Sequence, residues 1–296
     1  MAKLSPKHQN NTKVLFKHAV RKIEKKGQYF IIHSQDQVDL KVDKVILTMG
    51  GQAYRQTGST GDGYHLAESL GHHTSHLAPS LSSLVVAESW PSQVSGLSFA
   101  KAKITNQANK KQAATGPFIF THWGISGPAV FAFSSLVAFE NFSEIKPLKI
   151  FLDILPDLSL EKVLAQLKNF INTNPKKIFK NTLQSLVSLS LANIILEQLN
   201  INPDKKNSEI SKIELRRVVE FLKNLPLTIT ARRAGDEFVT AGGIDLSELD
   251  PSTMQSKICP QLYFAGEILD IDGFTGGFNL QAAWATGRLA GLKSAQ

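Results

Sequence analysis

A short apolar strand that runs directly into a glycine-rich loop and a helix constrains this chain more than any other feature. The pattern occupies residues 262–291, LYFAGEILDIDGFTGGFNLQAAWATGRLAG. Gly276 and Gly277 remove side chains where the helix begins, and the first turn of a helix has free backbone N–H groups. Such a turn brings backbone close to an anionic or electron-rich ligand. A tight turn that needs positive φ is the alternative on local sequence alone.

A second strand, glycine loop and helix lie near the start of the chain. Residues 44–48 (KVILT) predict a strand that is buried on both faces of a sheet, and Met49, Gly50 and Gly51 follow it. The loop GSTGDG and the run YHLAESLG predict a helix that stops at Gly71. Two such loops at the ends of two buried strands favour a crevice between them. Neither loop has the spacing G-x-G-x-x-G, and the sequence holds no Walker pattern.

The middle of the chain follows other periods. Strand-forming pieces such as SLVVA, GPFIFT and LKIFLDI recur over residues 81–157, which predicts a β-rich unit. Apolar residues then repeat at helical spacing over residues 158–226, with Ser159 as an N-cap. We therefore predict an insert domain over residues 81–232. The flanks, residues 1–80 and 233–296, are predicted to form one α/β domain.

Charge and composition narrow the class of protein. The net charge is +8, but the lysines are scattered and no nucleic-acid motif accompanies them, so we predict no nucleic-acid partner. The sequence holds no apolar run of about 18 residues, so we predict no membrane span. Cys259 is the single cysteine, which fits a reducing compartment and predicts a cytoplasmic protein.

Four histidines and the cysteine are considered for a chemical role. His72, His73 and His76 (GHHTSH) have a spacing that metal binding permits, but a linker before a strand is the favoured interpretation, and we predict no metal site. His122 in THWGISGP is the one candidate for a catalytic or substrate-binding role, and a structural histidine is its alternative. Cys259 has no neighbouring histidine or aspartate, which favours a core position.

Three blocks together carry a family resemblance. They are VILTMGG with TGSTGDGYHLAESLGH, FIFTHWGISGPAV at residues 118–130, and a nearly continuous stretch over residues 238–291. In these blocks the sequence resembles the bacterial NAD(P)/FAD-dependent oxidoreductases of the BaiN/YhiN type, the aminoacetone oxidase-like flavoprotein family. The matches run from about residue 13 to the end of the chain.

The resemblance implies a cofactor, a reaction and a set of site residues. The cofactor is FAD, with NAD(P)H as a further candidate for the electron donor, and the reaction is hydride transfer between a small organic substrate and the flavin N5. Residues 240–243 are implied to line the flavin side of the pocket. From the residues themselves, Glu267, Asp270 or Asp272 could accept hydrogen bonds from ligand hydroxyls. The resemblance implies cofactor contacts at Thr48, Gly50, Gly51, Gly266, Glu267, Asp272, Gly276, Gly277, Asn279 and Leu280.

The start of the chain departs from that family. Its members begin with a βαβ unit that carries G-x-G-x-x-G, and this sequence holds no such unit. We therefore expect an N-terminally truncated chain with an α/β fold. Its Rossmann-like FAD-binding domain would be incomplete, with the first βαβ absent, and interrupted by a β-barrel-like plus helical insert domain.

Several origins of such a chain stay open. It could be a fragment of a split or mis-started gene, one half of a two-chain protein, or a degenerate relative. A second chain that supplies the missing cofactor-binding unit is accordingly an expected partner. The alternative function is a non-catalytic fragment or subunit of a split flavoprotein that cannot hold FAD alone.

Overall fold

The computed structural model of this chain describes residues 12–35 and 39–296. The strands are β1 (Val20–Lys26), β2 (Tyr29–Ser34), β3 (Asp39–Val42), β4 (Val45–Leu47), β5 (Ala78–Ser80), β6 (Leu84–Val86), β7 (Ser98–Asn106), β8 (Ala113–Thr121), β9 (Gly124–Ser126), β10 (Leu148–Asp153), β11 (Leu225–Arg232), β12 (Val239–Ala241) and β13 (Leu262–Phe264). The α-helices are α1 (Asp62–Glu68), α2 (Pro128–Leu136), α3 (Leu160–Thr173), α4 (Phe179–Leu183), α5 (Leu189–Gln198), α6 (Lys212–Lys223) and α7 (Phe278–Ser294). The 3₁₀ helices are η2 (Arg55–Thr57), η3 (Trp90–Val94), η4 (Asn207–Glu209) and η5 (Leu246–Glu248).

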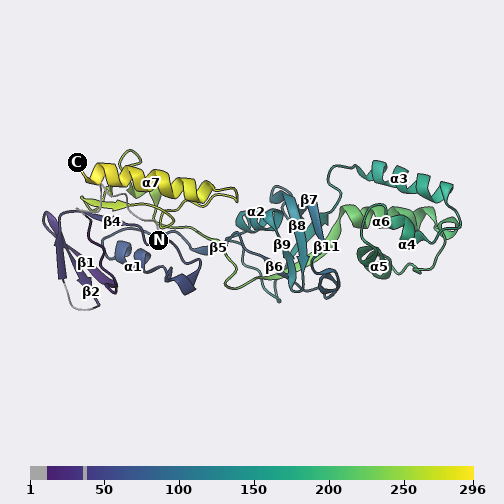
Figure 1. Cartoon of the computed structure of the whole chain (residues 1–296), viewed down its shortest axis with the longest axis horizontal. Coiled ribbons are helices and arrows are strands. Elements are labelled where there is room, and N and C mark those ends of the chain that lie inside the picture. Colours follow the sequence, from purple (N-terminus) through teal and green to yellow (C-terminus); the bar gives the residue numbers. More distant parts are fainter. Residues whose placement is uncertain (1–11, 36–38) are drawn as a thin grey trace.

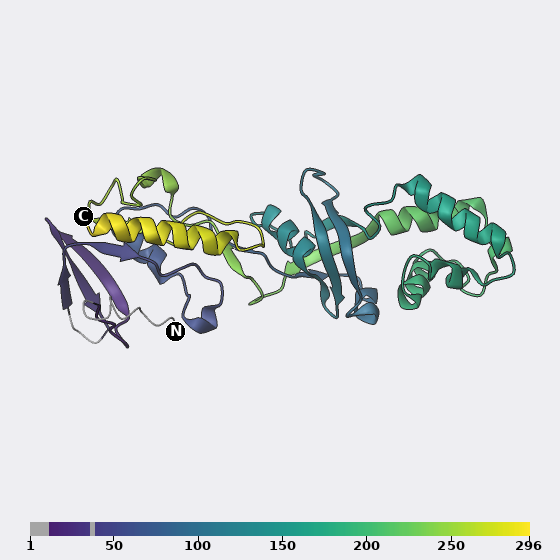
Figure 2. The ribbon, with the colours of Figure 1, turned by 45° about the horizontal axis from the view of Figure 1, so that its top comes forward.

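These elements are spread along the long axis of the molecule (Figure 1). Strands β1–β4 lie at one end together with α1 and α7, although α7 is the last helix of the chain. The barrel strands lie in the middle, and helices α3–α6 form the other end in both views (Figure 2). The first and last parts of the chain therefore share one end of the structure. Among the described residues, no helix is both long and apolar enough to cross a membrane.

A parallel strand pair joins the two ends of the chain. Strand β4 pairs with β13, with Leu47 opposite Phe264. Both faces of β4 were predicted to be buried, and this prediction is wrong at Ile46, which is 37% exposed. Successive side chains of a strand point to opposite faces, and the hydrophobic cluster here covers only the face of Val45 and Leu47.

The middle of the chain forms a closed six-stranded barrel in the order β10-β11-β6-β9-β8-β7. Large side chains such as Phe118, Phe120 and Ile150 fill it and are fully buried. Closure pairs every strand on both sides, so the barrel has no open sheet edge. The predicted mixed α/β class and the β-barrel are confirmed.

The helical region follows its capping residues. Ser159 accepts a hydrogen bond from the Lys162 amide at 3.3 Å, as expected for the N-cap of α3. Within the region predicted as helical, α4 and α5 are separate helices, because Ser188 caps a new helix start and accepts from the Leu191 amide at 3.3 Å. Helix α6 begins at a capping box of Ser211 and Glu214.

The buried hydrophobic side chains form two large separate clusters. One extends from Leu84 to Ile229 and contains the barrel and helices α2–α6. The other unites residues from Ile23 to Ala67 with residues from Ile244 to Ala290. The predicted domain boundaries and the absence of a first βαβ unit stay predictions.

A buried histidine connects α1 to the segment that carries β13. The His72 Nδ1 lies 2.9 Å from Glu248 Oε2, and its Nε2 lies 2.8 Å from the Ser256 hydroxyl. Its ring contacts Phe264 edge to face, with centroids 4.7 Å apart. Burial lowers the pKa of His72, while Glu248 opposes this shift. The neighbouring His73 is exposed but also bonds to Glu248. These histidines therefore position the loop around Glu248.

We expect His72→Ala to lower the free energy of unfolding by about 2–4 kcal/mol, since it removes a buried ring together with its hydrogen bonds to Glu248 and Ser256. The control His73→Ala should cost less, because that ring is exposed. The folded pKa of His72 lies below its ordinary value of 6.5, so its contribution is complete above pH 6.5 and declines as the pH falls below it. Chemical denaturation at pH 7.5 and 5 measures this, and an equal loss in His72→Ala at both values would contradict it.

Candidate functional site

The carboxyl ends of β4 and β13 bring the two glycine segments together. Leu47 and Phe264 are opposite each other in the parallel pair, so Gly50 and Gly51 follow one strand while Gly266 follows the other. Gly50 and Gly266 both have positive φ, 74° and 83°. A crevice at this edge of a parallel sheet is where such folds bind ligands.

Thr240 holds these segments to a third one. Its amide donates a hydrogen bond to Glu267 Oε1 at 2.9 Å, and its hydroxyl oxygen accepts from the amides of Gln52 at 2.7 Å and Ala53 at 3.2 Å. A Cβ atom on Gly51 would lie 2.5 Å from the Thr240 Oγ1 and 2.9 Å from Glu267 Oε1. Only glycine fits there without displacing its neighbours. The pKa of Glu267 is raised by burial, against the hydrogen bonds from Thr240.

The loop before α7 forms the second part of the site. The Asn279 side chain accepts from the Gly273 amide at 2.7 Å and donates to the Gly273 carbonyl at 2.9 Å, which closes the loop. Gly277 is the N-cap of α7, with φ 87° and no side chain that caps the helix. A Cβ atom built at Gly277 or at Gly266 would meet open space. Backbone N–H groups at this helix start are therefore accessible to a ligand.

The other predicted residues take different positions. Asp272 receives a hydrogen bond from the Ser80 hydroxyl at 3.5 Å, and its pKa is raised first by burial and then by Asp270. Thr48 and Leu280 are exposed. His122 lies on the exposed turn between β8 and β9, with its ring 4.2 Å from that of Trp123. The cofactor contacts assigned to Thr48, Asp272 and Leu280 stay predictions, and so does the catalytic or substrate-binding role of His122.

Two adjoining cavities lie beside Thr240. A small one of about 60 Å³ is lined by Gln52, Leu77, Ala78 and Thr240, together with Arg55, Pro79 and Glu237. A larger one of about 410 Å³ shares Arg55, Pro79 and Glu237 and adds Tyr54, Gln56, Arg232, Arg233, Ala234 and Gly235. Sequence analysis did not identify Tyr54, Arg55 or Arg233. The arginine pair in ARRAGDE, at the end of β11, was the one available signal.

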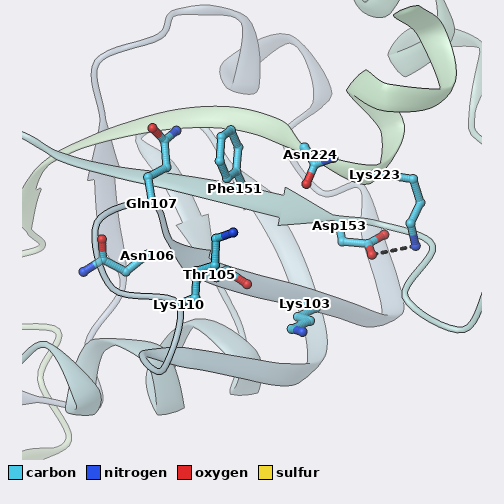
Figure 3. A pocket seen from close by; sticks show the side chains of 9 residues that line it. All are labelled: Lys103, Thr105, Asn106, Gln107, Lys110, Phe151, Asp153, Lys223 and Asn224. Carbon is cyan, nitrogen blue, oxygen red and sulfur yellow. Dashed lines mark ion pairs between the residues drawn. The ribbon is translucent and has the colours of Figure 1, made fainter. Parts of the chain in front are cut away.

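A further cavity of about 280 Å³ lies on the wall of the barrel (Figure 3). Two of its charged groups are engaged with each other: Lys223 Nζ lies 2.6 Å from Asp153 Oδ2, and it also donates to the carbonyls of Leu155 and Leu158. Lys223 thus fixes the end of α6 to the segment between β10 and α3. The cavities beside Thr240 are the better candidates, because they adjoin the glycine segments.

Comparison with known proteins identifies relatives over nearly the whole chain. A family model described as the HI0933-like protein Rossmann domain matches residues 3–293. A 3-dehydro-bile acid delta(4,6)-reductase of Clostridium scindens is 33% identical over 278 residues, which cover 93% of this chain and 67% of that protein. Ribosomal RNA dihydrouridine synthases of Haemophilus influenzae and Escherichia coli are 29% and 28% identical, over 82% of this chain and 58% of theirs. This chain thus matches only 58% of the length of the latter two.

We expect Gly51→Ala to disrupt the contact between the three segments. The added methyl group would overlap Thr240 Oγ1, so the loop must shift at a cost of roughly 1–3 kcal/mol in the free energy of unfolding. Gly287→Ala is the matched control, since a Cβ atom there meets nothing within 4 Å and alanine favours a helix. Thermal unfolding of both variants measures the difference. Equal stability of the two variants would contradict the assigned role of Gly51.

Proposed function

Because the chain belongs to the family of HI0933-like proteins with a Rossmann domain, we propose that it acts as a flavin-dependent oxidoreductase. The resemblance to the BaiN/YhiN-type flavoproteins is confirmed by this membership. The name of the bile acid reductase supports oxidoreduction as the class of reaction. FAD as the cofactor, NAD(P)H as the electron donor and a cytoplasmic location are parts of the proposal.

The observation that carries the proposal is the uncovered backbone after β13 and at the start of α7. A Cβ atom at Gly266 or Gly277 would meet nothing within 4 Å, so the backbone at both positions is open to a ligand. The start of α7 offers N–H groups and the positive end of a helix dipole. Glu267, directly after Gly266, adds a partly buried acceptor. This combination fits a cofactor with both an anionic linker and a hydrogen-bonding ring.

Different residues would contact different parts of such a cofactor. Gly266 would allow its ring system to approach the backbone, Gly50 and Gly51 would contact it from the end of β4, and Glu267 would accept hydrogen bonds from it. The first turn of α7, after Gly277, would face its anionic part. When bound, a flavin supplies the hydride acceptor and donor of the reaction.

The names of the relatives suggest the chemical class of substrate. A delta(4,6)-reductase of a 3-dehydro bile acid and a dihydrouridine synthase both saturate a carbon–carbon double bond conjugated to a carbonyl group. We extend this class to the present chain, with a small organic substrate. The task of this chain's own residues is then to orient the double bond and to deliver a proton to the carbon next to the carbonyl.

The exposed apolar side chains of α7 favour the binding of a partner chain. Of the described residues of α7, Ala290 alone is buried, while Phe278, Leu280, Trp284 and Leu292 are each more than half exposed. An exposed apolar face of this kind is typical of an interface. We propose that a second chain supplies a further cofactor-binding unit that covers it. A subunit that cannot hold FAD without that partner is the alternative function.

We expect the purified chain to take up FAD and show visible flavin absorbance. Glu267→Gln should weaken FAD binding about tenfold, because the amide replaces a charged acceptor with a neutral one while its oxygen still accepts from Thr240. Glu68→Gln on α1 is the control, since that side chain is exposed. Titration of each protein with FAD measures the affinities. A folded protein that takes up no FAD would reject the proposal and favour the subunit alternative.

We keep His122 as the candidate for the proton donor, since its ring lies against Trp123 near the larger cavity. His122→Asn should lower the rate of reduction of a 3-dehydro-delta(4,6) bile acid about 100-fold or more in the flavin-loaded protein. The control His65→Asn replaces an exposed histidine on α1. Stopped-flow absorbance measures the rates. A rate that differs less than about twofold from wild type would assign His122 a structural role.

A further inference from the structure

We propose that the larger cavity beside Thr240 binds an oxyanion of the substrate, a carboxylate or a phosphate, between Arg55 and Arg233. That the bound molecule is a substrate rests on the proposed function, but the anion site itself follows from the residues of the cavity. It names which end of the substrate the chain recognises. The unsaturated end would then extend toward Thr240.

The cavity has more cationic than anionic side chains. Its lining includes Arg55, Arg232, Arg233 and one carboxylate, Glu237. Arg232 is engaged elsewhere, because its Nη2 donates to the carbonyls of Val137 and Ala138 at the end of α2. Arg55 and Arg233 therefore remain available to a ligand, and Glu237 is the one carboxylate among the residues that line the cavity.

Both remaining guanidinium groups keep donors for an oxyanion. Arg55 uses Nη2 for Gln52 Oε1 at 2.9 Å, and a guanidinium has five N–H donors. The guanidinium of Arg233 lies 3.5 Å above the ring of Trp123, a stacking that orients its plane. Its Nε is 3.9 Å from Asp236 Oδ2, too far for a hydrogen bond. Arginine forks of this kind match carboxylate and phosphate geometry.

Aromatic side chains give the same region an apolar wall. Tyr54 lines the cavity, and its ring lies 6.0 Å from that of Phe238, which in turn lies 5.1 Å from that of Phe131. Tyr54 and Phe238 are 42% and 47% exposed, so the described residues leave much of both rings uncovered. Tyr54 also has a φ of 57°, a left-handed backbone that costs a non-glycine residue free energy. A planar unsaturated group of the substrate would pack against the exposed surface of these two rings.

The larger cavity adjoins the small cavity that Thr240 lines. The two share Arg55, Pro79 and Glu237, and the small one reaches Gln52 and Thr240. Thr240 in turn donates its amide hydrogen bond to Glu267. A volume of about 410 Å³ falls within the usual range of small-molecule sites, roughly 300–1,000 Å³. One substrate can therefore place its anionic end at the arginines and its reactive end toward Thr240.

Binding of matched charged and neutral probes tests the proposal. The first pair is a 3-dehydro-delta(4,6) bile acid and its methyl ester, and the second is uridine monophosphate and uridine. Isothermal titration calorimetry on the full chain, with and without FAD, should show at least one anionic probe bound about tenfold tighter than its neutral counterpart. Arg55→Gln and Arg233→Gln should each reduce that preference to about twofold or less. Arg216→Gln on α6 is the control, since this exposed arginine pairs with Glu220.

The pattern of results separates the possible outcomes. A preference in the bile acid pair identifies a carboxylate site, and one in the uridine pair identifies a phosphate site. No preference in either pair, or one that persists in both arginine variants, would overturn the proposal. A preference without FAD uptake would keep the anion site and reject the flavin function, because calorimetry on the unloaded chain does not depend on the cofactor.

Discussion

The parallel pairing of β4 with β13 is the constraint on which the rest of this structure depends. Parallel neighbours cannot be joined by a tight turn, so the chain between them must leave the pair and return to it. It does so through the barrel and the helices α2–α6, and it comes back through β12, which pairs with β5. The pairing also sets the two glycine segments next to each other. Thr240, in β12, then connects both of them through Gln52 and Glu267.

The closed barrel makes such a long insertion possible. Its core is separate from that of the α/β part, and closure leaves none of its strands with an open edge. Its last strand, β11, ends at Arg232, which lines the larger cavity, and Trp123 on the β8–β9 turn lies against Arg233. The insertion thus contributes directly to this cavity.

Local patterns predicted the elements better than their surroundings. The Ser159 cap, the barrel strands and the two glycine loops follow from short-range spacing, and the structure contains them. The exposure of Ile46 and the break between α4 and α5 depend on which faces other segments cover, which periodicity does not encode. Arg55 and Arg233 are distant in sequence, and only the return of the chain through β12 brings them to one cavity.

The electrostatics of the site keep its two polar regions independent. If an arginine lay beside Glu267, it would lower the pKa of that carboxyl group by favouring the charged form. Burial instead raises the pKa, and among the described residues only Thr240 acts against it. The arginines of the larger cavity therefore do not neutralise the acceptor in the crevice. The cofactor ring proposed at Glu267 and the oxyanion proposed at Arg55 and Arg233 would therefore occupy separate regions, and the small cavity, lined by both Arg55 and Thr240, connects the two regions.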